Sequence, residues 1–279
     1  MSFLKRANFR LLLERAKGLA MPIAKLPDAQ IHYEWSGQEH LPTLVFSNSL
    51  GTNLHMWDSQ IEEFTKHFRI LRCDTRGHGQ SSVTSGPYTI DQLSWDVVRL
   101  LDVLQQERVH FCGLSMGGMI GMFLGVNAPA RFHKFVLCNT AAKIGTAETW
   151  NTRIQTVQSG GMKAVAGAVV ERWFTPGFRT SHPTETQAVL AMLEAADPHG
   201  YIACCAAVRD MDQRHTLQSI RVPCLVIAGT SDPATPPEEG RYVAASIPGA
   251  KYVELPAAHL SNIEARDDFN RHVLQFLLA

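Results

Sequence analysis

The chain has 279 residues, which is long enough for one large α/β domain or for a domain with an insertion. Hydrophobic residues make up 45% of it and charged residues 19%, an ordinary globular composition that excludes extensive disorder. The 26 basic and 26 acidic residues cancel, and no apolar run approaches the ~18 residues of a membrane-spanning helix, so we expect neither nucleic acid nor a membrane as a partner.

Residues 1–20 form a basic segment that differs from the rest of the chain. Phe9, Leu12 and Leu13 fall on one side of it, which predicts a short amphipathic helix. The apolar stretch Leu11–Leu13 is too short for a secretory signal. We expect an added N-terminal extension, with a membrane-surface or targeting helix as the alternative. The domain proper is predicted to begin at Met21.

From residue 30 onward, short apolar runs alternate with helical periodicity. Helices are predicted around 57–68, after Asp91 as the capping residue, and over 116–127. Strands are predicted over 31–35, 43–47, 69–73, 109–114 and 134–139. Strands that alternate with helices indicate βαβ units, and the sequence therefore predicts a mostly parallel sheet with helices on both faces.

The alternation stops between residues 141 and 215, where only helical patterning is found. It resumes with strands over 222–229 and 251–255, a helix over 237–246 and a closing helix from Asp267. We therefore predict an α/β core formed by 21–140 and 216–279, and a helical cap formed by 141–215. Such a cap would cover the carboxyl ends of the strands, where open α/β sheets place their sites.

A five-residue motif lies between the fourth predicted strand and the helix that follows it. It reads Gly113-Leu114-Ser115-Met116-Gly117 and fits G-x-S-x-G. In this strand–turn–helix context the central serine is exposed on a strained turn, and the flanking glycines let strand and helix approach closely. The alternative is that Ser115 only caps the helix. A serine hydroxyl needs a base before it becomes a nucleophile, so the hypothesis also requires a histidine and an acid.

His259 and Asp232 are the predicted base and acid. His259 follows the last predicted strand, and Asp232 follows the strand over 222–229, so the two belong to loops at the same edge of the sheet. Asp210 and Asp212 lie in helical patterning and are expected to be solvated. Among the other histidines, His32 is expected at the surface or a sheet edge.

An oxyanion hole needs two backbone N–H groups near the nucleophile. The first is expected from the residue after the nucleophile, Met116, and the second from a loop after an early strand. That loop is 47–52, with the sequence SNSLGT, and its position in the turn makes Leu50 the predicted donor.

These motifs together resemble the α/β-hydrolase superfamily over residues 30–279, including the order serine, aspartate, histidine along the chain. A narrower resemblance, to the 3-oxoadipate enol-lactonases of aromatic catabolism, rests on five stretches: SNSLGT (47–52), DTRGHG (74–79), GLSMGG (113–118), CNTAAKIG (138–145) and HLSNIE (259–264). Ser-Asn-Ser stands where the superfamily more often has His-Gly, and this departure is itself similar to the enol-lactonases.

The resemblance implies a serine hydrolase that opens 3-oxoadipate enol-lactone through an acyl-enzyme, in the β-ketoadipate pathway. Ser115 would attack the lactone, His259 would take its proton and Asp232 would orient the imidazole. The substrate carries a carboxylate, so a cation is expected in its pocket. The candidate cations are Lys143 and Arg153, and Trp150 and Trp173 are the candidate apolar walls.

No metal or cofactor is expected. The six cysteines show no paired metal spacing, His78 lacks ligand partners at metal spacing, and no phosphate or dinucleotide fingerprint occurs. A chain of this length without a disulfide framework favours a reducing cytoplasm. The alternative functions are a general carboxylesterase, a C–C bond hydrolase of ring-cleavage products, or a non-catalytic ligand receptor on the same fold.

Overall fold

The computed structural model describes residues 22–279 and contains one eight-stranded sheet. The predicted N-terminal extension, 1–20, lies outside the described residues. The spatial order of the strands is β1-β2-β4-β3-β5-β6-β7-β8. Their bounds are β1 Ile23–Lys25, β2 Gln30–Ser36, β3 Thr43–Ser47, β4 Arg69–Cys73, β5 Val109–Leu114, β6 Phe132–Cys138, β7 Cys224–Gly229 and β8 Lys251–Leu255.

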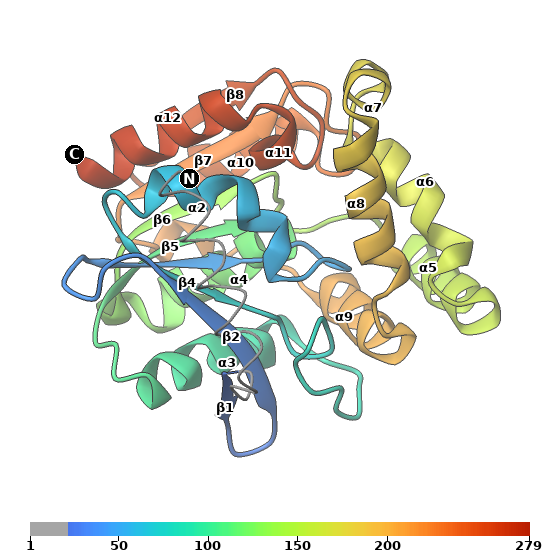
Figure 1. Ribbon diagram of the computed structural model, residues 1–279, viewed down its shortest axis with the longest axis horizontal. Helices are drawn as coiled ribbons and strands as arrows, with labels where there is room; N and C mark the ends of the chain where they lie inside the picture. The colour runs from blue at the N-terminus through green and yellow to red at the C-terminus, as the bar shows by residue number, and fades with distance from the viewer. Residues whose placement is uncertain (1–21) are drawn as a thin grey trace, which may run out of the picture.

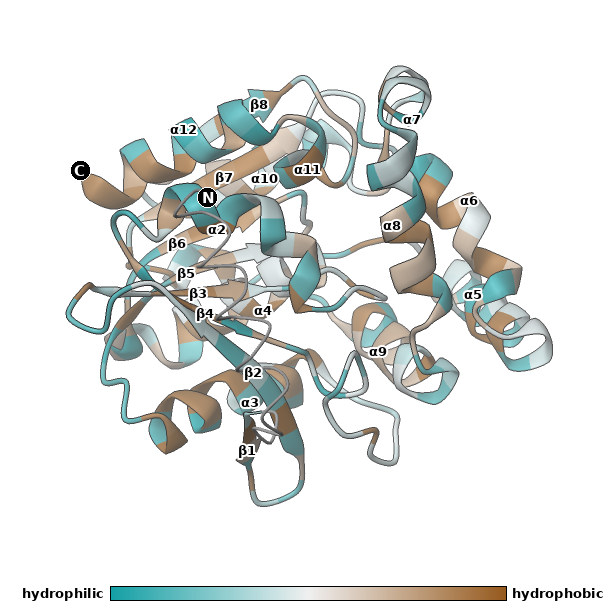
Figure 2. Ribbon diagram, viewed as in Figure 1, coloured by the Kyte–Doolittle hydropathy of each residue, from teal (hydrophilic) through white to brown (hydrophobic). Residues whose placement is uncertain are grey.

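The sheet is parallel from β4 to β8, and only β1 and β2 run antiparallel to their neighbours. Every residue of β3 and of β7 is buried, as expected for strands that are covered on both faces. Strand β7 is correspondingly drawn mostly in brown, the hydrophobic end of the colour scale (Figure 2). The predicted mostly parallel α/β sheet is therefore confirmed.

Two groups of helices cover the sheet (Figure 1). One group contains α2 (Asp58–Phe64), α11 (Ser261–Glu264) and α12 (Arg266–Leu278), which pack against one another. The other face carries α3 (Ile90–Val103), α4 (Met116–Asn127) and α10 (Pro237–Ser246); α4 packs on β3, β5 and β6, and α10 on β7 and β8. Short 3-10 turns lie at Leu54–Trp57, Pro129–Arg131 and Leu217–Ser219.

Five helices lie between β6 and β7, and they gather on one side of the molecule, at the right in Figure 1. They are α5 Ala147–Gly160, α6 Lys163–Trp173, α7 Pro176–Ser181, α8 Pro183–Glu194 and α9 Pro198–Asp210. No strand occurs between the described residues 139 and 223, as the sequence pattern predicts.

Several local expectations were wrong at the ends of elements. Thr89, rather than Asp91, caps α3, because its side chain accepts a hydrogen bond from the Gln92 N–H, and Asp91 lies in the first turn. The helix expected around 57–68 ends at Phe64, and Phe68 directly precedes β4. The short elements β1 and α11 were not predicted, since three or four residues carry too little periodicity to be recognised.

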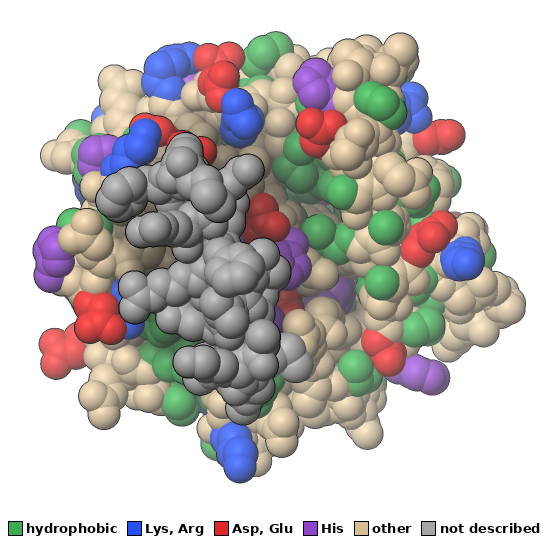
Figure 3. All heavy atoms as spheres, in the orientation of Figure 1, with side chains coloured by type: hydrophobic (Ala, Val, Ile, Leu, Met, Phe, Trp, Pro, Cys, Tyr) green, Lys and Arg blue, Asp and Glu red, His purple; other side chains and the backbone are tan. Residues whose placement is uncertain are grey.

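The exposed surface carries charges of both signs. On the part of one face that Figure 3 shows in colour, acidic and basic side chains are interspersed and do not form one large patch. Over residues 22–279, the helices are too short or too polar for any one of them to cross a membrane.

Gly113 and Gly167 allow a stability test of the turn between β5 and α4. A Cβ atom on Gly113 would lie 2.2 Å from the carbonyl oxygen of Gly117, whereas one on Gly167, in α6, would meet nothing within 4 Å. We expect Gly113→Ala to lower the free energy of unfolding by several kcal/mol, about 3 or more, through steric strain. Gly167→Ala should raise it by about 0.5–1 kcal/mol, because alanine restricts the unfolded chain and favours the helix. Urea denaturation measures both, and equal stability of the two variants would contradict this view of the turn.

Candidate active site

Ser115 occupies a strained turn between β5 and α4. Its backbone has φ 58° and ψ −115°, a conformation that non-glycine residues rarely adopt. The Ser115 side chain makes no capping hydrogen bond to α4, so the alternative that it merely caps the helix is wrong. A hydrogen bond from the Thr140 hydroxyl to the Ser115 carbonyl, 2.8 Å, and one from the Ser115 N–H to the Cys138 carbonyl, 2.9 Å, hold this backbone in place.

Asp232 and His259 meet at the carboxyl ends of β7 and β8. The Asp232 Oδ2 lies 2.8 Å from the His259 Nδ1, and both residues are buried. Among the described residues, no hydrogen bond engages Nε2, the other ring nitrogen of His259. His259 lines the same cavity as Ser115. The structure thus brings the three predicted residues to one edge of the sheet.

The Asp232 carboxylate accepts hydrogen bonds at both oxygens. The N–H groups of Ala234 and Thr235 donate to Oδ1 at 2.8 and 3.0 Å, and the Thr235 hydroxyl donates to Oδ2 at 2.7 Å. Burial by itself would raise the pKa of Asp232. His259, together with hydrogen bonds from the Asn139 side chain and the Thr235 N–H, outweighs this effect and lowers the pKa to about 2. Asp232 is therefore ionised at any physiological pH.

The predicted oxyanion residues also line this cavity. Leu50 and Met116 both contribute to its wall, and neither of their N–H groups donates to another residue within 22–279. The loop that carries Leu50 is held in place by His78, because the Gly51 N–H donates to the His78 Nε2 at 2.9 Å. Burial lowers the pKa of His78, which keeps this ring a neutral acceptor.

Asp74, in the DTRGHG stretch, braces the end of the loop over 47–54. Asp74 accepts hydrogen bonds at 2.8 Å from the N–H groups of Leu54 and Gln80. His32 was expected at the surface or a sheet edge. It lies on β2, next to the edge strand β1, but it is only 3% exposed and its Nδ1 lies 2.8 Å from the Asp74 Oδ2. The alternation of apolar and polar residues over 31–35 did not predict that His32 would be buried and paired with Asp74.

The cavity has a volume of about 350 Å³ and lies between the sheet edge and helices α5, α6 and α9. Three of the four predicted substrate residues line it: Trp150, Arg153 and Trp173. The Arg153 guanidinium lies 5.0 Å from the centre of the Trp150 ring. Lys143 does not line the cavity. Its amine lies 3.6 Å from Asp212 in a partly exposed ion pair, so its placement in the pocket was wrong.

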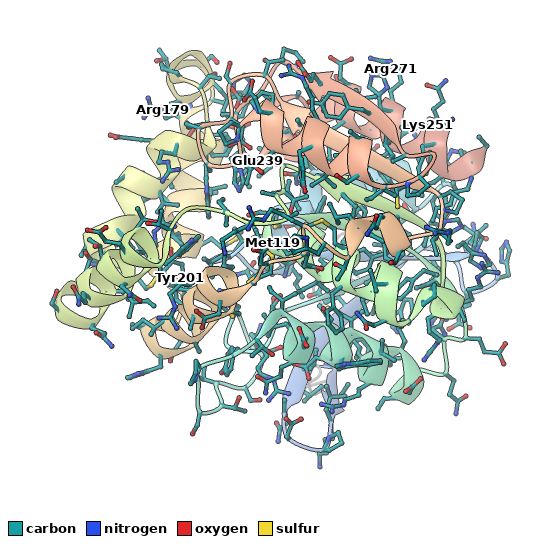
Figure 4. The ribbon with its side chains drawn as sticks, turned by 180° about the vertical axis from the view of Figure 1, so that it is seen from behind. Met119, Arg179, Tyr201, Glu239, Lys251 and Arg271 are labelled. Atoms are coloured by element: carbon teal, nitrogen blue, oxygen red, sulfur yellow. The ribbon has the colours of Figure 1, made fainter. Side chains whose placement is uncertain are left out.

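Arg172 is a second cation of the cavity, and sequence reasoning missed it. Its guanidinium donates to the Pro233 carbonyl at 3.0 Å. Burial lowers the pKa of Arg172, and the positive charge of Arg153 lowers it further, so an anion between the two would be stabilised. Met119, Tyr201 and Glu239, which Figure 4 labels, also line the cavity and come from α4, α9 and α10.

The end of α6 is hydrogen-bonded to the segment that carries His259. The Leu260 N–H donates to the Trp173 carbonyl at 3.1 Å. The Glu264 carboxylate accepts from the Ala258 N–H at 2.8 Å and from the Thr175 N–H and hydroxyl. Three contacts thus join the two segments beside the cavity.

No group of three or more histidine, cysteine, aspartate or glutamate side chains is placed to hold a metal ion within residues 22–279. The six cysteines are all buried and unpaired. The reactive groups that line the cavity are a buried hydrogen-bonded imidazole, a strained serine and two arginines.

Comparison with known proteins agrees with this geometry. A family model described as the alpha/beta hydrolase fold matches residues 42–173, and one described as TAP-like protein matches 194–278. The chain is thus an α/β hydrolase. It is 44% identical over 246 residues to 3-oxoadipate enol-lactonase 2 of Acinetobacter baylyi. The aligned residues make up 88% of this chain and 92% of that protein. The chain belongs to the family of 3-oxoadipate enol-lactonases.

Two further relatives support the assignment. The chain is 38% identical over 234 residues to 3-oxoadipate enol-lactonase 1 of Acinetobacter baylyi, covering 84% of this chain and 88% of that one. The crystal structure of the enol-lactonase from Burkholderia xenovorans LB400 superposes with a TM-score of 0.91 at 45% identity, over 92% of this chain and all of that one. The predicted fold class and hydrolase class are therefore confirmed.

Proposed function

We propose that this protein hydrolyses 3-oxoadipate enol-lactone to 3-oxoadipate. The observation that carries the proposal is the placement of Ser115, the Asp232–His259 pair and two arginines around one cavity. The enol-lactonase relatives indicate the substrate, and the cavity offers matching chemistry: an acyl-transfer nucleophile at one side and cations for a carboxylate at another.

In the proposed reaction the Ser115 oxygen attacks the lactone carbonyl while the His259 Nε2 accepts its proton. Asp232 holds the proton of Nδ1 and stabilises the imidazolium that forms. The N–H groups of Leu50 and Met116 donate to the oxyanion. Collapse of the tetrahedral intermediate breaks the ring C–O bond, and the enol that leaves is protonated and becomes a ketone. Water activated by His259 then releases the acid and frees Ser115.

We propose residues 141–215 as the cap of this site, with 21–140 and 216–279 as the core. Helices α5, α6 and α9 supply Trp150, Arg153, Trp173 and Tyr201 to the cavity wall. The aromatic rings exclude water from the lactone, and Arg153 and Arg172 bind the substrate carboxylate. This activity belongs to aromatic catabolism in the β-ketoadipate pathway, and six unpaired cysteines fit a reducing cytoplasm.

Replacing either arginine should weaken binding of the carboxylate. We expect Arg153→Ala and Arg172→Ala each to raise KM for the lactone by about 10-fold or more, since a hydrogen bond to a charged group is worth about 1.5–3 kcal/mol. Lys143→Ala is the matched control, because Lys143 is paired with Asp212 outside the cavity, and it should leave KM unchanged. Steady-state kinetics would contradict this assignment if the arginine variants bound the lactone as well as the control does.

The proposed function is tested by offering the purified protein the enol-lactone and, separately, a simple nitrophenyl ester. We expect kcat/KM for the lactone at or above about 10⁴ per molar per second, well above the value for the ester. A preference for the ester would favour the general carboxylesterase. Turnover of neither would favour a ligand receptor on this fold.

A further inference from the structure

Asn139 directly follows strand β6 and has an unusual backbone conformation. Its φ is 44°, in the left-handed region that asparagine tolerates better than most residues. The residue is 1% exposed, and its N–H donates to the Ile227 carbonyl of β7 at 2.7 Å. Asn139 is absent from the wall of the active-site cavity. It is thus held rigidly beside the site without facing the substrate.

The side-chain amide of Asn139 is completely engaged. Nδ2 donates to the Asp232 Oδ2 at 3.0 Å and to the Ala258 carbonyl at 3.1 Å, and Oδ1 accepts from the Ser261 hydroxyl at 2.6 Å. Two acceptors on one side and a donor hydroxyl on the other fix the orientation of the amide. The same amide therefore contacts the carboxylate after β7 and the segment on both sides of His259 after β8.

We propose that Asn139 is a positioning residue that sets the Asp232 carboxylate and the His259 segment relative to each other. The Asp232 oxygen that Asn139 contacts, Oδ2, is the one that lies 2.8 Å from the His259 Nδ1. Asn139 therefore keeps Oδ2 in the direction of the imidazole, and through Ala258 and Ser261 it keeps the imidazole within reach. This inference rests on the proposed roles of Ser115, Asp232 and His259.

Two substitutions are compatible with the positive φ or with the side-chain shape at this position. Asn139→Gly tolerates a positive φ and removes all three contacts of the amide, to Asp232, Ala258 and Ser261. Asn139→Asp keeps the shape of the side chain but places a carboxylate where Nδ2 now donates to Asp232 and Ala258. Of the titratable groups, Asp232 contacts Asn139 directly, His259 contacts Asp232, and Glu264 accepts from the Ala258 N–H. The charge of Arg172 also acts on Asp232, and the thiol of Cys138, next to Asn139 in the chain, contacts that of Cys112.

The pH dependence distinguishes positioning from mere support of the fold. A second carboxylate beside Asp232 favours the protonated imidazole of His259, and a protonated imidazole cannot act as a base. The acidic limb of kcat/KM should therefore move to higher pH by about one unit or more in Asn139→Asp. A purely structural defect would lower kcat/KM by the same factor at every pH, and the acidic limb of the profile would stay at its wild-type pH.

The experiment records kcat, KM and the pH profile of kcat/KM with a nitrophenyl ester, so that it does not depend on lactone specificity. We expect Asn139→Gly to lower kcat about 10-fold or more with KM nearly unchanged, because the amide does not contact the substrate. Asn127→Asp, an exposed asparagine at the end of α4, is the matched control and should behave like the wild type.

Two outcomes would overturn the proposal: wild-type kcat in Asn139→Gly, or an unmoved acidic limb in Asn139→Asp. Thermal unfolding of each variant is measured alongside, and all rates are taken well below the lowest melting temperature. Ser115→Ala is assayed in parallel. If it retains full activity, the proposed function fails, whereas an inactive Ser115→Ala with unaffected Asn139 variants removes only the role of Asn139.

Discussion

Ser115→Ala should reduce kcat for the lactone by at least about 10⁴-fold, because removing the nucleophile abolishes the acyl-enzyme route. The fold should survive, since the Ser115 hydroxyl makes no capping bond and its backbone contacts do not depend on the side chain. Single-turnover and steady-state assays of lactone loss measure the effect.

The control for this variant is Ser49→Ala, which removes the hydroxyl of another serine in the same cavity wall. We expect the Ser49 variant to stay within about 10-fold of the wild-type kcat, because a neighbouring hydroxyl contributes at most one hydrogen bond. The reverse pattern, an active Ser115 variant and an inactive Ser49 variant, would show that Ser115 is not the nucleophile.

Asp232→Asn is the second substitution with a very large expected effect. The amide has the same shape as the carboxylate, but its N–H group would face the His259 Nδ1 and force the ring proton onto Nε2, the nitrogen that must accept from Ser115. We expect kcat to fall about 10⁴-fold. The loss should persist from neutral to mildly alkaline pH, because Asp232 of the wild type, with its pKa lowered to about 2, is ionised throughout that range.

Asp210→Asn separates this effect from a general loss of negative charge. Asp210 also lies between Ser115 and His259 in the sequence, but in the structure it is exposed at the end of α9 and paired with Arg209. Its substitution should leave kcat unchanged and reduce stability by less than about 1 kcal/mol. A large loss of kcat in Asp210→Asn, with none in Asp232→Asn, would show that Asp232 is not the acid of the site.

Much of the fold was predictable because apolar runs are sharply bounded. Strands β3, β4 and β8 and helices α4 and α10 have the predicted bounds. A polar or proline residue adjoins at least one end of each: Pro42, Asp74, Pro256, Ser115 and Pro236. The meeting of Asp232 with His259 was predictable for a related reason. Parallel strands bring their carboxyl ends to one edge, so polar residues that follow such strands become neighbours.

The substrate-binding residues were harder to predict, since charged positions on α5–α9 look alike in sequence. Lys143, which precedes α5, and Arg172, in α6, are both cations of the predicted cap. Only the packing of α6 against α5 and α8 places Arg172 in the cavity, whereas Lys143 pairs with Asp212. Asn139 did carry a signal: it ends the predicted strand beside the one that leads to Asp232. A polar residue at that position could have been recognised as a neighbour of the acid.

The hydrogen bonds that join α6 and Thr175 to the His259 segment have a consequence for engineering. The Leu260 N–H donates to the Trp173 carbonyl, and the Thr175 N–H and hydroxyl donate to Glu264. Transplanting the α5–α9 helices from another hydrolase, to exchange one set of substrates for another, would also exchange half of these contacts. A graft without hydrogen-bond partners for Glu264 and Leu260 would change the position of His259 even if its new pocket were well formed. Substrate range and catalytic rate therefore cannot be altered independently at this junction.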